Sequence, residues 1–193
     1  MVFRRRSSRW RRNPGPGRRP IRRAAIRQLR NAHDLMDAGQ WSQAAELFER
    51  LASAAEDHGL TQAPQLFLRS GRARIENGDR VIGIKHLQHA VHLFGQTGQI
   101  HRLYQIRLRL ISELKQRGFD RDAVELDSAI HDLLDRSNTA GTHVDPQSSR
   151  GHLAVKCPSC GGTLRPDEME WLDRLSGVCA YCGSVVQTEF QNE

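Results

Sequence analysis

The sequence has few aromatic residues and no long apolar run. Aromatic side chains make up only 6% of the 193 residues, so a core must rest on Leu, Ile, Val and Ala, which favours small helical units over a sandwich of sheets. No run approaches the ~18 apolar residues that span a bilayer, so we expect no integral membrane protein. A secretory signal would place an apolar stretch where residues 11–15 read Arg-Arg-Asn-Pro-Gly, so we expect a cytoplasmic protein.

Acidic residues are missing from the first 30 positions, which hold twelve arginines. The formal net charge of +7 therefore comes from this end, because residues 31–193 carry 17 basic groups against 22 acidic ones. Residues 1–19 lack apolar periodicity, and Pro14 to Gly17 would interrupt a helix, so we predict a disordered arm.

The arm has four interpretations. It could contact nucleic-acid phosphates, contact an anionic membrane surface, act as an organellar transit peptide, or serve as a solubilising tail with no specific partner. The candidate contact residues are Arg4, Arg5, Arg6, Arg9, Trp10, Arg11, Arg12, Arg18 and Arg19.

From residue 20 to residue 136 the apolar residues recur at steps of three and four, which predicts helices. Gly39, Gly78 and Gly118 lie 39 and 40 residues apart. A small residue follows each glycine by five positions, in the order Ala44, Gly83 and Ala123. Glycine permits a tight turn, and a small residue lets two antiparallel helices approach closely, so three helix pairs are expected.

This spacing resembles the tetratricopeptide repeat, and the best match runs from Gly39 through Trp41 and Ala44 to Phe48. The period exceeds the family's ~34 residues, which predicts longer connections between the pairs. The resemblance implies that the first helix of each pair lines a concave face that binds protein segments. The candidate groove residues are Arg69, Arg72, Arg102 and Arg107. They would suit an acidic ligand, or they form an ordinary solvated face.

All four cysteines lie in two Cys-x-x-Cys pairs, Cys157 with Cys160 and Cys179 with Cys182. Two such turns can present four thiolates to one Zn²⁺ at ~2.3 Å. The motif resembles a zinc ribbon over residues 153–193, preceded by a polar linker at 137–152. Strands are expected at 153–155, in part of the insert 165–173, and at 185–188. Two disulfides are the alternative, but the lack of a secretion signal favours metal. Four thiolates complete the coordination, so the zinc should be structural.

The predicted ribbon is acidic, with three basic residues against six acidic ones in 151–193. It would repel a phosphate backbone, so it is expected to contact a protein or the arm. No Gly-rich phosphate loop, His-Glu-x-x-His motif or nucleophile elbow is present. His86, His89 and His92 are expected to be surface and groove residues rather than ligands.

The predicted fold class is therefore mostly α, with three antiparallel helix pairs resembling tetratricopeptide repeats and a small β zinc ribbon. The predicted function is a non-enzymatic adaptor that binds a protein partner and carries one structural Zn²⁺. The alternatives are a nucleic-acid-associated or regulatory factor, in which the arm contacts phosphates, and a peripheral membrane scaffold on anionic lipid.

Overall fold

The computed structural model describes residues 18–137, 155–172 and 176–187, which form six helices and three short strands. The prediction of a mostly helical chain with a small β region near its C-terminus is confirmed. Of the predicted arm only Arg18 and Arg19 lie within the described residues, and of the predicted linker only Ser137 does. No helix in the described part of the chain is long and apolar enough to cross a bilayer.

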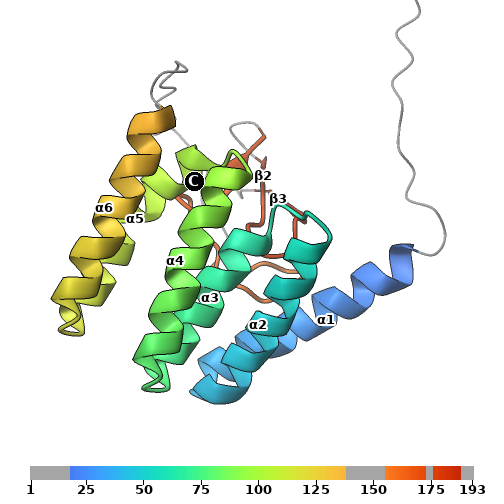
Figure 1. The fold of residues 1–193 in the computed structure, drawn as a ribbon. Coiled ribbons are helices and arrows are strands. Elements are labelled where there is room, and N and C mark those ends of the chain that lie inside the picture. The colour runs from blue at the N-terminus through green and yellow to red at the C-terminus, as the bar shows by residue number, and fades with distance from the viewer. Residues whose placement is uncertain (1–17, 138–154, 173–175, 188–193) are drawn as a thin grey trace, which may run out of the picture.

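The helices stand side by side and alternate in direction (Figure 1). They are α1 (Arg18–Asp37), α2 (Trp41–Asp57), α3 (Ala63–Glu76), α4 (Arg80–Gln96), α5 (Ile100–Gln116) and α6 (Asp120–Ser137). Each packs on its neighbour in sequence, and α4 also packs on α6. The odd-numbered helices therefore form one layer and the even-numbered helices the other.

Each of the five turns between helices contains a glycine in the left-handed region, with φ from 61° at Gly59 to 87° at Gly78. The residue after the glycine donates its N–H to a carbonyl five residues back, as in Gln40 to Leu35 at 2.9 Å. This is the hydrogen bond of a Schellman motif, which satisfies the last carbonyls of a helix within one tight turn.

The sequence predicted longer connections between the helix pairs. This prediction is wrong for the turn from α4 to α5. Residues 97–99 form that turn and are as few as residues 38–40 between α1 and α2. Gly98, with φ of 69°, closes the turn in the same way as the other glycines. The long period comes from helix length instead, because α2, α4 and α5 have 17 residues each.

The backbones of α3 and α4 touch where Gly71 faces Gly83. A Cβ built on Gly83 would lie 2.8 Å from the Gly71 carbonyl oxygen, and one on Gly71 would lie 2.9 Å from that of Gly83. Ala44 and Ala123, the corresponding small residues of the other pairs, are fully buried. The recurring small residue is thus buried in all three pairs, and in the pair of α3 and α4 it lies where the two backbones touch.

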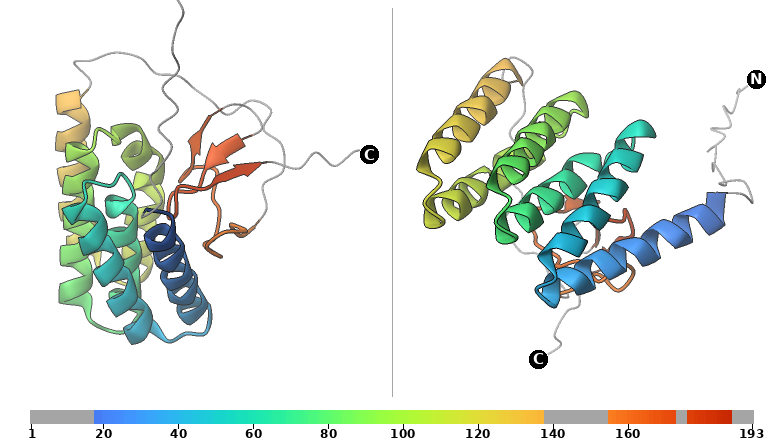
Figure 2. Two further views of the ribbon diagram at one scale, coloured as in Figure 1. Left: turned by 90° about the vertical axis from the view of Figure 1, so that its right-hand side faces the viewer. Right: turned by 60° about the horizontal axis from the view of Figure 1, so that its bottom comes forward.

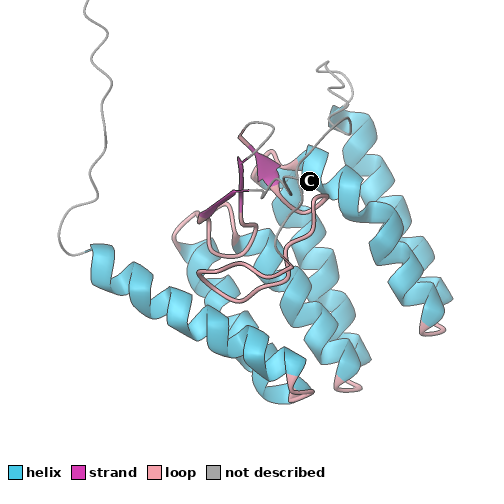
Figure 3. Ribbon diagram, turned by 180° about the vertical axis from the view of Figure 1, so that it is seen from behind, coloured by secondary structure: helices cyan, strands magenta, loops and turns pink. Residues whose placement is uncertain are grey.

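The C-terminal module, residues 155–172 and 176–187, contains an antiparallel sheet in the order β1 (Glu170–Trp171), β2 (Ser176–Val178), β3 (Val185–Gln187). β3 and a strand within the insert, here β1, were expected, but β2 was not, and Val155 forms no strand. A single bridge joins Lys156 to Thr163. Seen from behind, the module lies over the layer of α1, α3 and α5 (Figure 3), and its place at one side of the helices is also clear in Figure 2. Its buried residues continue the helical core.

Candidate metal centre and its docking face

Each Cys-x-x-Cys pair forms a turn with the same backbone hydrogen bonds. In the first turn the Cys157 N–H donates to the Gly162 carbonyl and the Gly161 N–H donates to the Cys157 carbonyl, both at 2.8 Å. In the second turn, Cys179 pairs with Ser184 and Gly183 in the same pattern, at 2.9 Å each. Gly161 and Gly183 have φ of 73° and 66°, a region that glycine adopts without strain.

The four cysteine sulfurs lie within 4.8 Å of one another and could hold a metal ion. The Sγ–Sγ distance is 3.8 Å both for Cys157 with Cys182 and for Cys160 with Cys179. A tetrahedral site with metal–sulfur bonds of ~2.3 Å has edges of about 3.8 Å, whereas a disulfide brings two sulfurs to ~2.05 Å. All four thiols are free, so the geometry fits a metal centre and not the alternative of two disulfides.

Backbone N–H groups also point at the sulfurs. Gly162 contributes such a bond to Cys160, Cys182 to Cys179, and Ser184 to Cys182. Hydrogen bonds from backbone N–H groups stabilise thiolates, the form of cysteine that binds metal. Within the described residues no other group of His, Cys, Asp or Glu side chains has the geometry of a metal site.

A buried carboxylate, Glu168, lies next to the metal centre and is only 2% exposed. The Tyr181 hydroxyl, from the turn between Cys179 and Cys182, donates to its Oε2 at 2.6 Å. Arg109 binds its Oε1 from α5, and Arg72 approaches the same oxygen from α3 at 3.6 Å. Burial by itself raises the pKa of Glu168, but Arg69, Arg72 and Arg109 outweigh this and hold the pKa below its ordinary range.

Further ion pairs and hydrogen bonds between the helices and the module surround Glu168. Arg102 of α5 lies 3.2 Å from Glu170, and Arg109 also binds Asp167. Arg30 of α1 donates to the carbonyls of Pro158 and Ser159 at 2.9 and 2.7 Å, and Lys156 binds Asp37. We call Arg30, Arg69, Arg72, Arg102 and Arg109 the arginine face. It belongs to α1, α3 and α5, the first helices of the three pairs.

Three of the four candidate groove residues lie in the arginine face, and the fourth does not. Arg69 donates to the Tyr181 hydroxyl at 2.8 Å, and Arg72 and Arg102 bind carboxylates of the module. Arg107 instead forms a two-bond pair with Asp127 of α6, at 2.6 and 3.0 Å. The candidate arm residues Arg4 to Arg12 lie outside the described residues. Arg18 and Arg19 belong to the first turn of α1.

Sequence reasoning missed the roles of Glu168, Tyr181 and Arg109. The signal was available as a charge pattern, because residues 167–170 are acidic and the first helices are rich in arginine. Sequence alone does not say that the two segments meet.

His33 of α1 packs on the other side of Tyr181. The two rings meet edge to face at 4.8 Å, and His33 also meets Phe48 at 5.1 Å. Burial, together with the charge of Arg69, lowers the pKa of His33 to about 3. Burial also raises the pKa of Tyr181 to about 12. Tyr181 is therefore a hydrogen-bond donor at neutral pH, and His33 is an uncharged packing residue.

Ser70, His86 and Glu49 line up in the order of a catalytic triad. The Ser70 hydroxyl lies 2.9 Å from His86 Nδ1, and His86 Nε2 lies 3.7 Å from Glu49. Ser70 is fully buried, however, and its hydroxyl also bonds the Ala45 carbonyl at 3.3 Å. A substrate cannot reach this oxygen, so the arrangement ties α2, α3 and α4 together and does not form a nucleophile.

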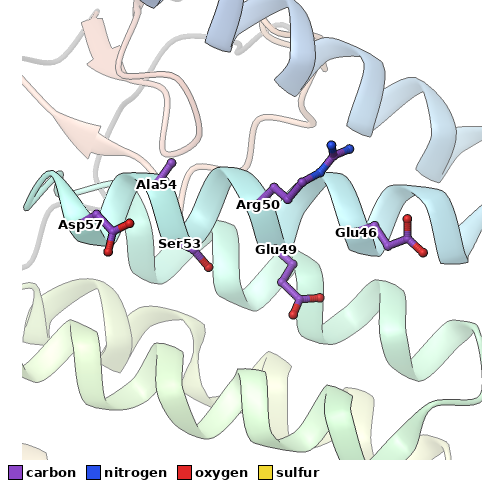
Figure 4. Close-up of a pocket in the computed structure, with 6 residues that line it drawn as sticks. All are labelled: Glu46, Glu49, Arg50, Ser53, Ala54 and Asp57. Carbon is purple, nitrogen blue, oxygen red and sulfur yellow. The ribbon is translucent and has the colours of Figure 1, made fainter.

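The surface of α2 carries a shallow depression, drawn in Figure 4. It is lined by Glu46, Glu49, Arg50, Ser53, Ala54 and Asp57. All six belong to one helix, and the labelled side chains point in different directions. Such a surface lacks the convergent polar groups of a ligand site.

Comparisons with protein-family models, curated proteins and solved structures find no match for this chain. The described residues themselves offer two chemical capabilities. The four thiols can hold a metal ion with complete coordination. The arginine face holds an acidic chain segment through ion pairs, three of them to the buried carboxylate of Glu168.

Proposed function

We propose that this chain is a non-enzymatic adaptor, in which three helix pairs resembling tetratricopeptide repeats bind a protein partner. One observation supports this above all: the layer of first helices already binds a protein segment, residues 167–170, through the arginine face. A face that holds the chain's own segment by carboxylate–guanidinium pairs has the chemistry to hold another protein's segment.

We further propose that the C-terminal module is a zinc ribbon with one structural Zn²⁺. The two Sγ–Sγ distances of 3.8 Å suit a tetrahedral site with Zn–S bonds of ~2.3 Å. Four thiolates leave no open position for water or substrate, so the metal would hold the module together rather than react. Metal analysis of the purified chain should give one zinc per chain, and a value far from one would refute the ribbon.

Affinity purification of the tagged full-length chain tests the adaptor function. The lysate is treated with nuclease and washed at high salt, and the bound proteins are quantified by mass spectrometry. An adaptor retains a protein at a near-equal molar amount. Arg72→Ala should lose this protein, whereas Arg80→Ala should keep it, because Arg80 pairs with Asp122 of α6 away from the module.

The same experiment separates the other two functions. A nucleic-acid-associated factor would lose its bound material after nuclease treatment, and its affinity would fall steeply with salt. A peripheral membrane scaffold would float with vesicles containing anionic lipid. Deleting residues 1–17 should abolish either behaviour, because both rest on the arginines of the arm. Recovery of nucleic acid or lipid alone would overturn the adaptor proposal.

A further inference from the structure

The arginine face is a built binding site rather than a solvated surface. The side chains of Arg69, Arg72 and Arg102 are only 11%, 12% and 10% exposed. A buried guanidinium needs an anionic partner because removing it from water is unfavourable. One set of partners comes from a short acidic segment, residues 167–170, which the face holds across α3 and α5. The helices supply a further partner, Glu113 of α5, which lies 2.8 Å from Arg72 and 3.7 Å from Arg109.

The acidic segment does not satisfy the face completely. Arg72 Nη2 and Arg109 Nε are buried without a hydrogen-bond partner among the described residues. A segment with more carboxylates at this place could pair with both groups. The chain's own segment therefore fits the face, but it does not use all the donors that the face presents.

Little regular structure holds the acidic segment in position. It lies between the two cysteine turns, and only its last residue, Glu170, belongs to a strand. That strand, β1, and its partner β2 have two and three residues. Glu168 is fixed by Tyr181, which stands between the two ligand cysteines of the second turn. A module of this size cannot bury enough surface to fold alone, so its order depends on the metal centre.

We propose that the arginine face binds an acidic segment of the protein partner, and that the metal-loaded C-terminal module occupies this face as an intramolecular competitor. The proposal rests on the adaptor function above and names its partner chemistry and its regulation. Tethering gives the chain's own segment an effective concentration of about millimolar. Loss of the metal frees the face, because the segment then loses the turns that position Glu168.

A fluorescent hexaglutamate peptide serves as the probe for the open face, because it carries more carboxylates than the chain's own segment. It is titrated into the full-length chain, loaded with zinc or stripped by a chelator, and binding is read by fluorescence anisotropy. Removing zinc should tighten peptide binding at least ~10-fold, since the tethered segment is no longer held in the position that competes. A hexaglutamine peptide should bind weakly to both forms.

Variants of the chain locate the peptide on the face. In the stripped chain Arg72→Ala should lose most of the binding, while the matched Arg80→Ala should keep it. In the zinc-loaded chain Glu168→Gln should raise peptide binding. Glu170→Gln should raise it much less, because Glu170 is 67% exposed.

Three outcomes would overturn the proposal. Peptide affinity could be the same with and without zinc, Arg72→Ala and Arg80→Ala could behave alike, or far-UV circular dichroism could show that the helices unfold when zinc leaves. The last outcome would make the module a structural part of the helical array rather than a competitor. If the peptide fails but a stoichiometric protein is still captured from lysate, the adaptor function stands and the competitor does not. If the peptide binds as expected but no protein is captured, the competitor stands and the adaptor function does not.

Discussion

Tyr181 donates a 2.6 Å hydrogen bond to the buried carboxylate of Glu168. The same tyrosine stands between Cys179 and Cys182, and it receives a hydrogen bond from Arg69 of α3 at 2.8 Å. The candidate metal centre, the acidic segment and the helical layer thus meet at one phenol group. A substitution in any of the three should lower the stability of the other two, because the polar network is buried and each member depends on its partners.

Replacing Glu168 with Gln should destabilise the chain by about 3 kcal/mol, because Arg69, Arg72 and Arg109 would lose the buried negative charge that they share. The free energy of unfolding of the zinc-loaded chain, measured in urea, checks this. Glu170→Gln is the control, since its pair with Arg102 is exposed on the carboxylate side and should cost only about 0.5 kcal/mol. Equal effects of the two substitutions would show that Glu168 is not buried among arginines in solution.

We predict that the folded chain loses stability in mild acid because His33 is buried in its neutral form. Its pKa is lowered from 6.5 to about 3 in the folded chain, mainly by burial. The unfolded chain therefore binds one more proton between these values. The stabilisation is present above pH 6.5 and falls by up to about 1.4 kcal/mol per pH unit as the pH drops through this window.

The contribution of His33 is isolated by comparing wild type with His33→Phe between pH 5 and pH 7. Glu168 does not affect the comparison in this pH range. A carboxylate with a lowered pKa contributes stability that is lost only below about pH 4.5. The variant should have a flatter stability profile than wild type. His92→Phe, at an exposed position of α4, should keep the wild-type slope. Parallel profiles for wild type and His33→Phe would contradict a buried, neutral His33.

We predict that a side chain at position 162 would clash with residues beside the candidate metal centre. A Cβ on Gly162 would lie 2.6 Å from Tyr181 Cδ2 and 2.7 Å from His33 Nε2. Gly162→Ala should cost about 2 kcal/mol or more through overpacking and should weaken zinc retention in a chelator competition assay. The control is Gly59→Ala, which has φ of 61° but no atom within 4 Å of the added carbon. It should cost about 1 kcal/mol through backbone strain alone, with no effect on zinc retention.

The helical part of the fold was largely predictable from sequence because its signals are local. A small residue follows each of Gly39, Gly78 and Gly118 by five positions, and the apolar residues recur at steps of three and four on either side. Gly98 was not anticipated as a turn, so the connection from α4 to α5 was expected to be too long. It is nevertheless the same left-handed glycine as the others.

The candidate metal ligands were also predictable, since Cys-x-x-Cys spacing encodes the turn directly. The docking of the module was not, because Arg109 and Glu168 lie 59 positions apart. Both are charged residues, which without further information are expected to be solvated. Only the three-dimensional arrangement shows that Glu168 leaves water, and that Arg107 pairs with α6 while its neighbour Arg109 pairs with the module.

The docking of the module on the helices is tested most directly by a double-mutant cycle between Glu168→Gln and Arg109→Met. Unfolding free energies of the wild type, both single variants and the double variant are measured with zinc bound. Because Arg109 contacts Glu168, the coupling energy should be about 1.5 kcal/mol or more. The control cycle between Glu168→Gln and Arg80→Met should be additive within about 0.5 kcal/mol. Additivity in the Glu168–Arg109 cycle would contradict the docked arrangement.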